Sequence, residues 1–110
     1  MNDNFNTRNA EHRNLLAKLN NAVADLNFYA YRFLTRAGLS STPRTGLADI
    51  DRHRAKAPPE RWPEQLDQIA NQNFKIINAT PETANELFRE TWHFVHDFDH
   101  IFRHDNHTRI

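Results

Sequence analysis

The sequence contains no cysteine, only two glycines, and no excess of charge of either sign. Without cysteine the chain can form neither a disulfide nor a cysteine-ligated zinc site. Its 14 basic and 14 acidic residues cancel when the histidines are neutral, which disfavours tight non-specific binding to nucleic acid. The chain also lacks an apolar run of membrane-spanning length, and its first residues are too polar for a signal peptide. We therefore expect a soluble, cytoplasmic protein.

The apolar content is enough for one modest core. The chain has 110 residues, 38% of them hydrophobic, and a mean hydropathy of −0.85. Eight Phe, two Trp and two Tyr argue against intrinsic disorder, and the length fits a single domain over 1–110. Because a thin core favours burial against another chain, we expect a homodimer or a complex with a protein partner.

Apolar residues recur every three or four positions through most of the chain, a spacing typical of amphipathic helices. The pattern predicts a long helix over 8–37 ending at Gly38, a short helix over 47–55, a third beginning at Pro63, and a last one from about 81 to 104 or slightly beyond. The expected fold is all-α, a small antiparallel bundle of three long helices plus a short one.

The segments between these helices are predicted from their composition. Residues 39–46 and 56–62 are expected to be loops, and residues 1–8 to be flexible. Thr80 is expected to cap the last helix. In the third helix the residues expected to face inward are Leu66, Ile69, Ala70, Phe74 and Ile77. The two tryptophans, Trp62 and Trp92, are expected to pack in the core or at its edge.

The last predicted helix carries a stripe of histidines. Five of the seven histidines, His93, His96, His100, His104 and His107, fall within fifteen residues and, at helical spacing, within an arc of about 80°. Arg89 and Arg103 lie on or beside the same stripe. The opposite side is apolar, with Leu87, Phe94, Val95, Phe98, Ile101 and Phe102. The stripe is therefore expected to face away from the core, and a solvated surface without chemistry is one interpretation of it.

Metal binding is another interpretation of the stripe. His96 and His100, like His100 and His104, have the i, i+4 spacing that can chelate zinc, nickel or copper. The candidate ligands are His93, His96, Asp97, His100 and His104. One helix rarely supplies three or four converging ligands, so His12 or His53 would have to contribute from elsewhere. We rank this hypothesis third and expect no cofactor.

The stretch "RETWHFVH", residues 89–96, separates Arg89 from His96 by six residues. This resembles the Arg-x(4–6)-His signature of the HEPN superfamily, small helical bundles common in prokaryotic toxin–antitoxin and defence systems. The wider region resembles HepT-like members, with "RWPEQLDQIANQ" as a Trp-led helix and "FDHIFRHDNH" as the Arg-His segment. The resemblance covers roughly residues 61–107. Asp99 stands where that family would have an arginine.

The resemblance implies a metal-independent endoribonuclease. Arg89 would act as the phosphate clamp and His96 as base or acid, with His93 as a further catalytic candidate. Histidine suits proton transfer near neutral pH, and a fixed arginine can stabilise the charge of a phosphorane. The supporting candidates are His100, Arg103 and His104. Opposing two copies about a two-fold axis would place a pair of each group in one cleft. The departure at Asp99 leaves open whether the site is inactive or Arg89 serves instead.

A non-enzymatic function is the main alternative. A helical binding module, such as an immunity protein, an antitoxin or a phage-encoded inhibitor, would use the histidine stripe as its partner interface. The balanced charge and the lack of a strong catalytic motif favour this hypothesis. RNA remains an alternative ligand, whereas neither a membrane nor a small molecule is expected.

Overall fold

The structure is a computed structural model that describes the backbone of residues 2–108 and, within it, the side chains of residues 10, 11 and 13–103. This backbone forms four α-helices and one 3-10 turn, and it contains no strand. The elements are α1 (Asn2–Arg36), α2 (Gly46–Arg54), η1 (Pro59–Arg61), α3 (Glu64–Ile77) and α4 (Pro81–Thr108). The predicted all-α fold of three long helices and a short one is confirmed.

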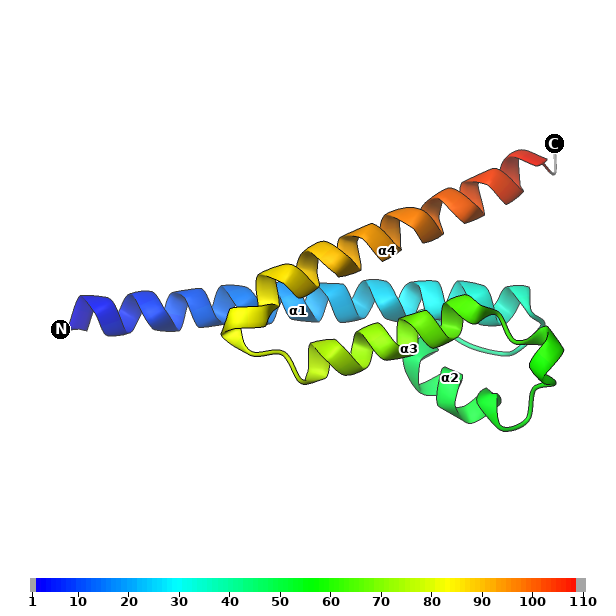
Figure 1. Ribbon diagram of the computed structural model, residues 1–110, viewed down its shortest axis with the longest axis horizontal. Helices are drawn as coiled ribbons and strands as arrows, with labels where there is room; N and C mark the ends of the chain where they lie inside the picture. The colour runs from blue at the N-terminus through cyan, green and yellow to red at the C-terminus, as the bar shows by residue number, and fades with distance from the viewer. Residues whose placement is uncertain (1, 109–110) are drawn as a thin grey trace.

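Helix α1 is the spine of the molecule, because it contacts each of the other three helices. In Figure 1, α3 runs antiparallel to α1, whereas α4 runs in the same direction as α1 and diverges from it toward the C-terminus. The start of α1 extends beyond the other helices, and the molecule measures 58 × 33 × 20 Å. Its radius of gyration of 16.5 Å exceeds the roughly 13 Å expected of a compact chain of this length. The bundle is therefore elongated, and one of its helix pairs is parallel.

One apolar cluster joins all four helices. The C-terminal third of α1 supplies Leu26, Ala30, Phe33 and Leu34, all of them buried. Against them pack Ile50 from α2, Leu66 and Ile69 from α3, and Phe98 and Phe102 from α4. The inward side of the last helix is therefore the apolar side that the sequence predicts.

Gly38 ends α1 in the way its position predicts. Its φ of +83° lies in the left-handed region that favours glycine. The Leu39 N–H donates to the Leu34 carbonyl at 2.9 Å, and the Gly38 N–H donates to the Thr35 carbonyl at 3.0 Å. These two bonds form a Schellman motif, which satisfies carbonyl groups that the end of the helix leaves free.

Helix α2 begins against the backbone of α1, one residue inside the predicted 39–46 loop. A Cβ at Gly46 would overlap the backbone oxygen of Asn27 and lie 2.7 Å from the Tyr31 nitrogen. Asn27 also caps α2, because its side-chain oxygen accepts a 2.9 Å hydrogen bond from the Leu47 N–H. Glycine is required at this position because α2 approaches the α1 backbone closely, and not because the backbone adopts a positive φ.

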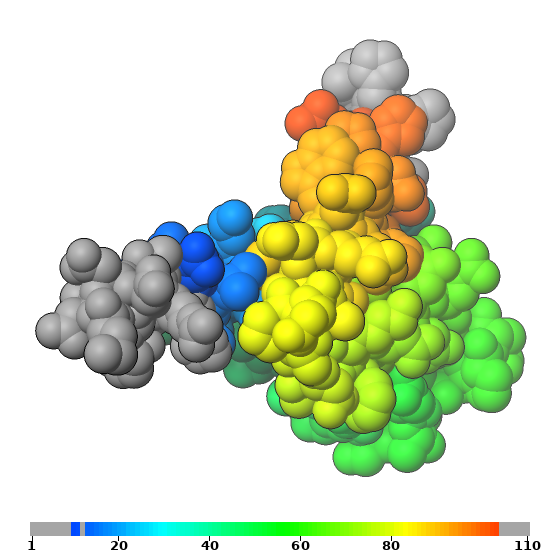
Figure 2. Space-filling model, turned by 60° about the vertical axis from the view of Figure 1, so that its left-hand side comes forward, coloured from blue at the N-terminus to red at the C-terminus, as the bar shows by residue number. Residues whose placement is uncertain are grey.

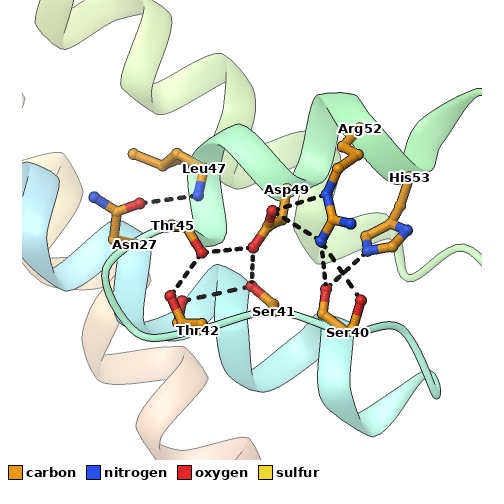
Figure 3. A network of polar contacts seen from close by, with 9 residues as sticks. All are labelled: Asn27, Ser40, Ser41, Thr42, Thr45, Leu47, Asp49, Arg52 and His53. Atoms are coloured by element: carbon orange, nitrogen blue, oxygen red, sulfur yellow. Dashed lines mark hydrogen bonds and ion pairs between the residues drawn. The ribbon is translucent and has the colours of Figure 1, made fainter.

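A buried carboxylate, Asp49, fixes the loop before α2 (Figure 3). Its oxygens accept hydrogen bonds from Ser41 and Thr45, each at 2.7 Å, and from the Arg52 guanidinium at 3.1 Å. Arg52 and His53 also donate to the Ser40 carbonyl, at 3.1 and 2.7 Å. The loop is thus held by side-chain contacts along its length.

Helix α3 differs from its prediction in two respects. Pro63 has an extended backbone and precedes the helix, which begins at Glu64, and the predicted 56–62 loop contains η1. The expectation that Phe74 and Ile77 face inward is wrong, because they are 68% and 70% exposed. The inward face instead runs through Leu66, Ile69, Gln72 and Ile76. Gln72 can be buried because its amide donates to the Thr91 hydroxyl of α4 at 3.0 Å.

Thr80 precedes α4 as predicted, but among the described contacts its hydroxyl meets only the Thr83 hydroxyl and accepts no helix N–H. The Thr80 carbonyl accepts the first helical hydrogen bonds, from the N–H groups of Thr83 and Ala84. The Thr83 hydroxyl in turn accepts the Thr80 N–H at 3.0 Å, as the third residue does in a capping box. None of the helices in the described range combines the length and apolar character needed to span a membrane.

Candidate functional site

The outer face of α4 carries Arg89, His93, His96 and His100, which together form the histidine ridge. All four side chains are exposed, and they lie opposite the buried side chains of α4: Ala84, Leu87, Thr91, Phe98 and Phe102. Figure 2 shows α4 standing above the rest of the molecule, so that its outer side meets no other element in this view. The predicted outward orientation therefore holds for this part of the stripe. The side chains of His104 and His107 lie outside the described residues.

Arg89 is a cation of the ridge without a partner among the described residues. Its guanidinium makes no hydrogen bond or ion pair with the part of the chain that the structure describes. His93 follows it by one turn and His96 by two, about 10 Å along the helix axis. The three side chains therefore form a line on a convex surface. Three cavities among the described residues are lined by other side chains, and none of them by Arg89, His93, His96 or His100.

Trp92 lies beside this line and is 61% exposed, so the expectation that it packs in the core or at its edge is wrong. Its ring stacks on His96, with centroids 5.2 Å apart and planes 8° apart. It also meets His93 edge to face, at 5.3 Å and 78°. Stacking of this kind favours the observed orientation of the His96 imidazole. Trp92 therefore orders the middle of the ridge while exposing most of its own apolar surface.

Asp99 connects α4 to α1. Its carboxylate accepts a hydrogen bond from the Tyr29 hydroxyl at 3.3 Å and forms an ion pair with Arg103 at 2.8 Å. Burial raises the pKa of Tyr29, and the negative charge and hydrogen bond of Asp99 raise it further. Asp99 thus has structural partners where the HEPN resemblance would place an arginine. Arg103, a supporting candidate, is engaged by Asp99.

The proposed metal ligands do not converge. No group of three or more His, Asp or Glu side chains suited to a metal ion exists among the described residues. His93, His96, Asp97 and His100 are all exposed on α4. His53 is bound to the Ser40 carbonyl in the loop before α2, and the side chains of His12 and His104 lie outside the described residues. A single convex helix face therefore offers at most a pair of neighbouring ligands.

A groove between α1 and α4 was not predicted from the sequence. Its volume is about 200 Å³, and it is lined by Lys18, Asn21, Ala22, Asp25, Phe88, Thr91, Trp92 and Val95. We call it the seam groove. Its walls come from segments far apart in the chain, so helical periodicity alone could not reveal it. The one signal in the sequence is that Lys18, Asn21 and Asp25 share a face at helical spacing.

The two segments that carry the HEPN resemblance lie on neighbouring helices. "RWPEQLDQIANQ" leads into α3 and "FDHIFRHDNH" lies on α4, and the two helices are joined by the bond between Gln72 and Thr91. Comparison of the chain with protein-family models, with curated proteins and with solved structures found no match. What the chain does is therefore inferred from the chemistry of its own surface.

Proposed function

We propose that the protein is a non-enzymatic helical binding module whose histidine ridge, together with Trp92, contacts a protein partner. The observation that carries this proposal is the exposure of Trp92 at 61%, stacked on His96 in the middle of the ridge. Tryptophan and arginine are enriched among the residues that dominate binding energy at protein interfaces. Here both types are exposed on one face of α4, one turn apart.

The shape and charge of the ridge indicate what kind of partner it fits. Small-molecule and catalytic sites are usually concave, whereas this ridge is convex and its residues line none of the three cavities found among the described side chains. A convex helix face fits a groove in another protein. Because the Arg89 guanidinium has no partner among the described side chains, a carboxylate in that groove would complement it. An immunity protein, an antitoxin or an inhibitor would bind a target in this manner.

The test compares baits that differ only on the ridge. Wild type, Trp92→Ala, Arg89→Ala and Arg44→Ala proteins are immobilised and exposed to extract of the source cells. Arg44 is exposed and forms no hydrogen bond or ion pair with other described residues, so its variant is the matched control. We expect one protein to bind wild type and Arg44→Ala in equal amounts and to be lost from both ridge variants. Identical binding to all four baits would contradict the proposal.

RNA cleavage is the second candidate, and it is favoured by the alignment on one face of His93, His96 and Arg89, which has no partner among the described side chains. One histidine would take the proton of the 2′-hydroxyl, whose oxygen attacks phosphorus. A second would protonate the departing 5′-oxygen, and Arg89 would stabilise the charge in between. The convex face of one chain does not enclose a phosphodiester, so this chemistry would need a second copy to complete a cleft.

The nuclease hypothesis has its own assay. Purified protein is incubated with mixed tRNA and structured RNA in EDTA, beside the Arg89→Ala/His96→Ala variant. Cleavage that resists EDTA and is lost in the variant would favour the nuclease over the binding module. Intact RNA with wild-type protein would exclude cleavage of these substrates.

A further inference from the structure

The seam groove combines an apolar floor with an exposed tryptophan wall. Ala22, Val95, Phe88 and Trp92 all line it. At about 200 Å³ it is smaller than typical small-molecule pockets, which measure about 300–1,000 Å³. It is, however, large enough to receive part of an apolar side chain. Exposed apolar surface next to such a notch is characteristic of a protein contact.

Two opposite charges flank the groove on α1. Lys18 and Asp25 both line it, seven residues apart on one face, a separation of about 10 Å along the axis. Neither forms an ion pair with another described residue, and the Lys18 ammonium lies 5.8 Å from the centre of the Phe88 ring. The Asp25 side chain is exposed, but the neighbouring groove walls partly desolvate its carboxyl and raise its pKa, and no cation from the described part of its own chain pairs with it. Both groups would gain from a partner that supplies the opposite charge.

The arrangement of these charges is self-complementary. A two-fold axis perpendicular to α1, passing between Lys18 and Asp25, reverses the direction of α1 in the second copy. Lys18 of each copy then faces Asp25 of the other, and the apolar centres of the two grooves meet. We propose that the seam groove is the contact surface of a homodimer, in which two Lys18–Asp25 pairs flank the packed Trp92 side chains.

The same features favour a second copy over other occupants. A nucleic-acid strand would be repelled by the Asp25 carboxylate, and the balanced net charge provides no general attraction to it. An unrelated protein would need a matching pair of charges at the same spacing, whereas a second copy carries that pair by symmetry. The proposal shares Trp92 with the ridge proposal, because this side chain also lines the groove, but the charges that it rests on, Lys18 and Asp25, lie on α1 outside the ridge.

The charges allow a test by exchange. Lys18→Glu and Asp25→Lys each place two like-charged pairs across the proposed interface, so both variants should dimerise at least about tenfold more weakly than wild type. In an equimolar mixture of the two variants, the introduced glutamate of one chain faces the introduced lysine of the other, and the native Asp25 faces the native Lys18. Dimers should therefore return in the mixture, and also in the Lys18→Glu/Asp25→Lys double variant. Sedimentation velocity measures each state, and far-UV circular dichroism confirms that every variant is folded.

Specific outcomes would overturn the proposal. The proposal would be overturned if the wild-type protein remained monomeric at concentrations up to about 1 mM. A dimer whose stability is the same in both single variants would also overturn it, because the interface would then lie elsewhere. Binding of a single-stranded oligonucleotide that is lost in Lys18→Glu, without any dimer, would assign the groove to nucleic acid instead. The Arg89→Ala variant should dimerise as wild type does, so a failure of the ridge proposal leaves this result intact.

Discussion

At the scale of single residues, the strongest polar anchor is Asp49. Burial raises its pKa, but the hydrogen bonds from Ser41, Thr45 and Arg52 and the charge of Arg52 lower it more, and the pKa lies below its ordinary value. A depressed carboxyl pKa contributes stability that is present above the unfolded value of about 3.9 and is lost as the pH falls through the folded value. The network is thus expected to stabilise the fold at neutral pH and to fail in acid.

Replacement of Asp49 by Asn tests this pH dependence. Asp49→Asn removes the charge but keeps the size, and we expect it to lower the free energy of unfolding by about 1–3 kcal/mol at pH 7. At pH 3 the difference from wild type should shrink, because pH 3 lies below the unfolded pKa of about 3.9, so part of the stability contributed by the depressed pKa is already lost. Urea unfolding of both proteins at pH 7 and pH 3 measures this difference in the free energy of unfolding. Asp51→Asn, at an exposed position of the same helix, is the control and should change little. An equal loss for Asp49→Asn at both pH values would show that its charge plays no part.

The two glycines are predicted to differ in their tolerance of alanine. Gly46→Ala would drive a Cβ into the backbone of Asn27, so α2 must move from α1, at a cost of about 3 kcal/mol or more. Gly38→Ala meets no atom within 4 Å and carries only the strain of its positive φ, about 1–2 kcal/mol. Thermal unfolding of both variants ranks them. A larger loss for Gly38→Ala would mean that α2 can shift without cost.

The contrast between the glycines shows what a sequence can specify at this scale. Gly38 was predicted because a left-handed helix cap is local and follows directly from the end of the apolar pattern. The requirement at Gly46 arises from the approach of a helix nineteen residues earlier in the chain, at Asn27. For the same reason, the hydrogen bond between Tyr29 and Asp99, which are seventy residues apart, could not be predicted from the sequence. Contacts that depend on tertiary approach leave no periodic signal.

At the scale of helices, the existence and order of all four could be predicted, since each has its own apolar period and breaker residues. The rotation of α3 could not, because its apolar surface is wider than the strip that the core can cover. Ala70, Phe74 and Ile77 form one edge of that surface, and Ile69 and Ile76 lie on the other. Burial of Gln72 against Thr91 decides between them. On α4 the outward stripe was predicted, but the exposure of Trp92 was not.

This rotation predicts the effect of substitutions on α3. The double variant Phe74→Gln/Ile77→Gln should change the free energy of unfolding by no more than about 0.5 kcal/mol, because both side chains are already exposed. Ile69→Ala, at a buried position of the same helix, should cost about 2–5 kcal/mol. Denaturant unfolding of the two variants separates these values. A large loss in the double variant would indicate that Phe74 and Ile77 are covered in solution, by another chain or by a rotated α3.

At the scale of the whole molecule, α1 decides how the protein unfolds. Because each of the other helices packs on it and one apolar cluster includes residues of all four, no helix has a core of its own. Removing any helix would expose part of that cluster. Such an arrangement favours one cooperative transition over the stepwise loss of helices.

The two tryptophans can test this cooperativity, since Trp62 precedes α3 near α2 and Trp92 lies on the seam between α1 and α4. In Trp62→Phe only the α4 region reports by fluorescence, and in Trp92→Phe only the α2–α3 region does. We expect the urea midpoint and the slope from each fluorophore to coincide with those from far-UV circular dichroism of the same variant. Both variants are made in the Lys18→Glu protein, which we expect to dimerise only weakly, so that self-association does not contribute to the unfolding transitions. If the Trp92 signal changed at lower urea than the helical signal, α4 would separate from α1 first. The shared cluster would then be weaker at α4 than at α2 and α3.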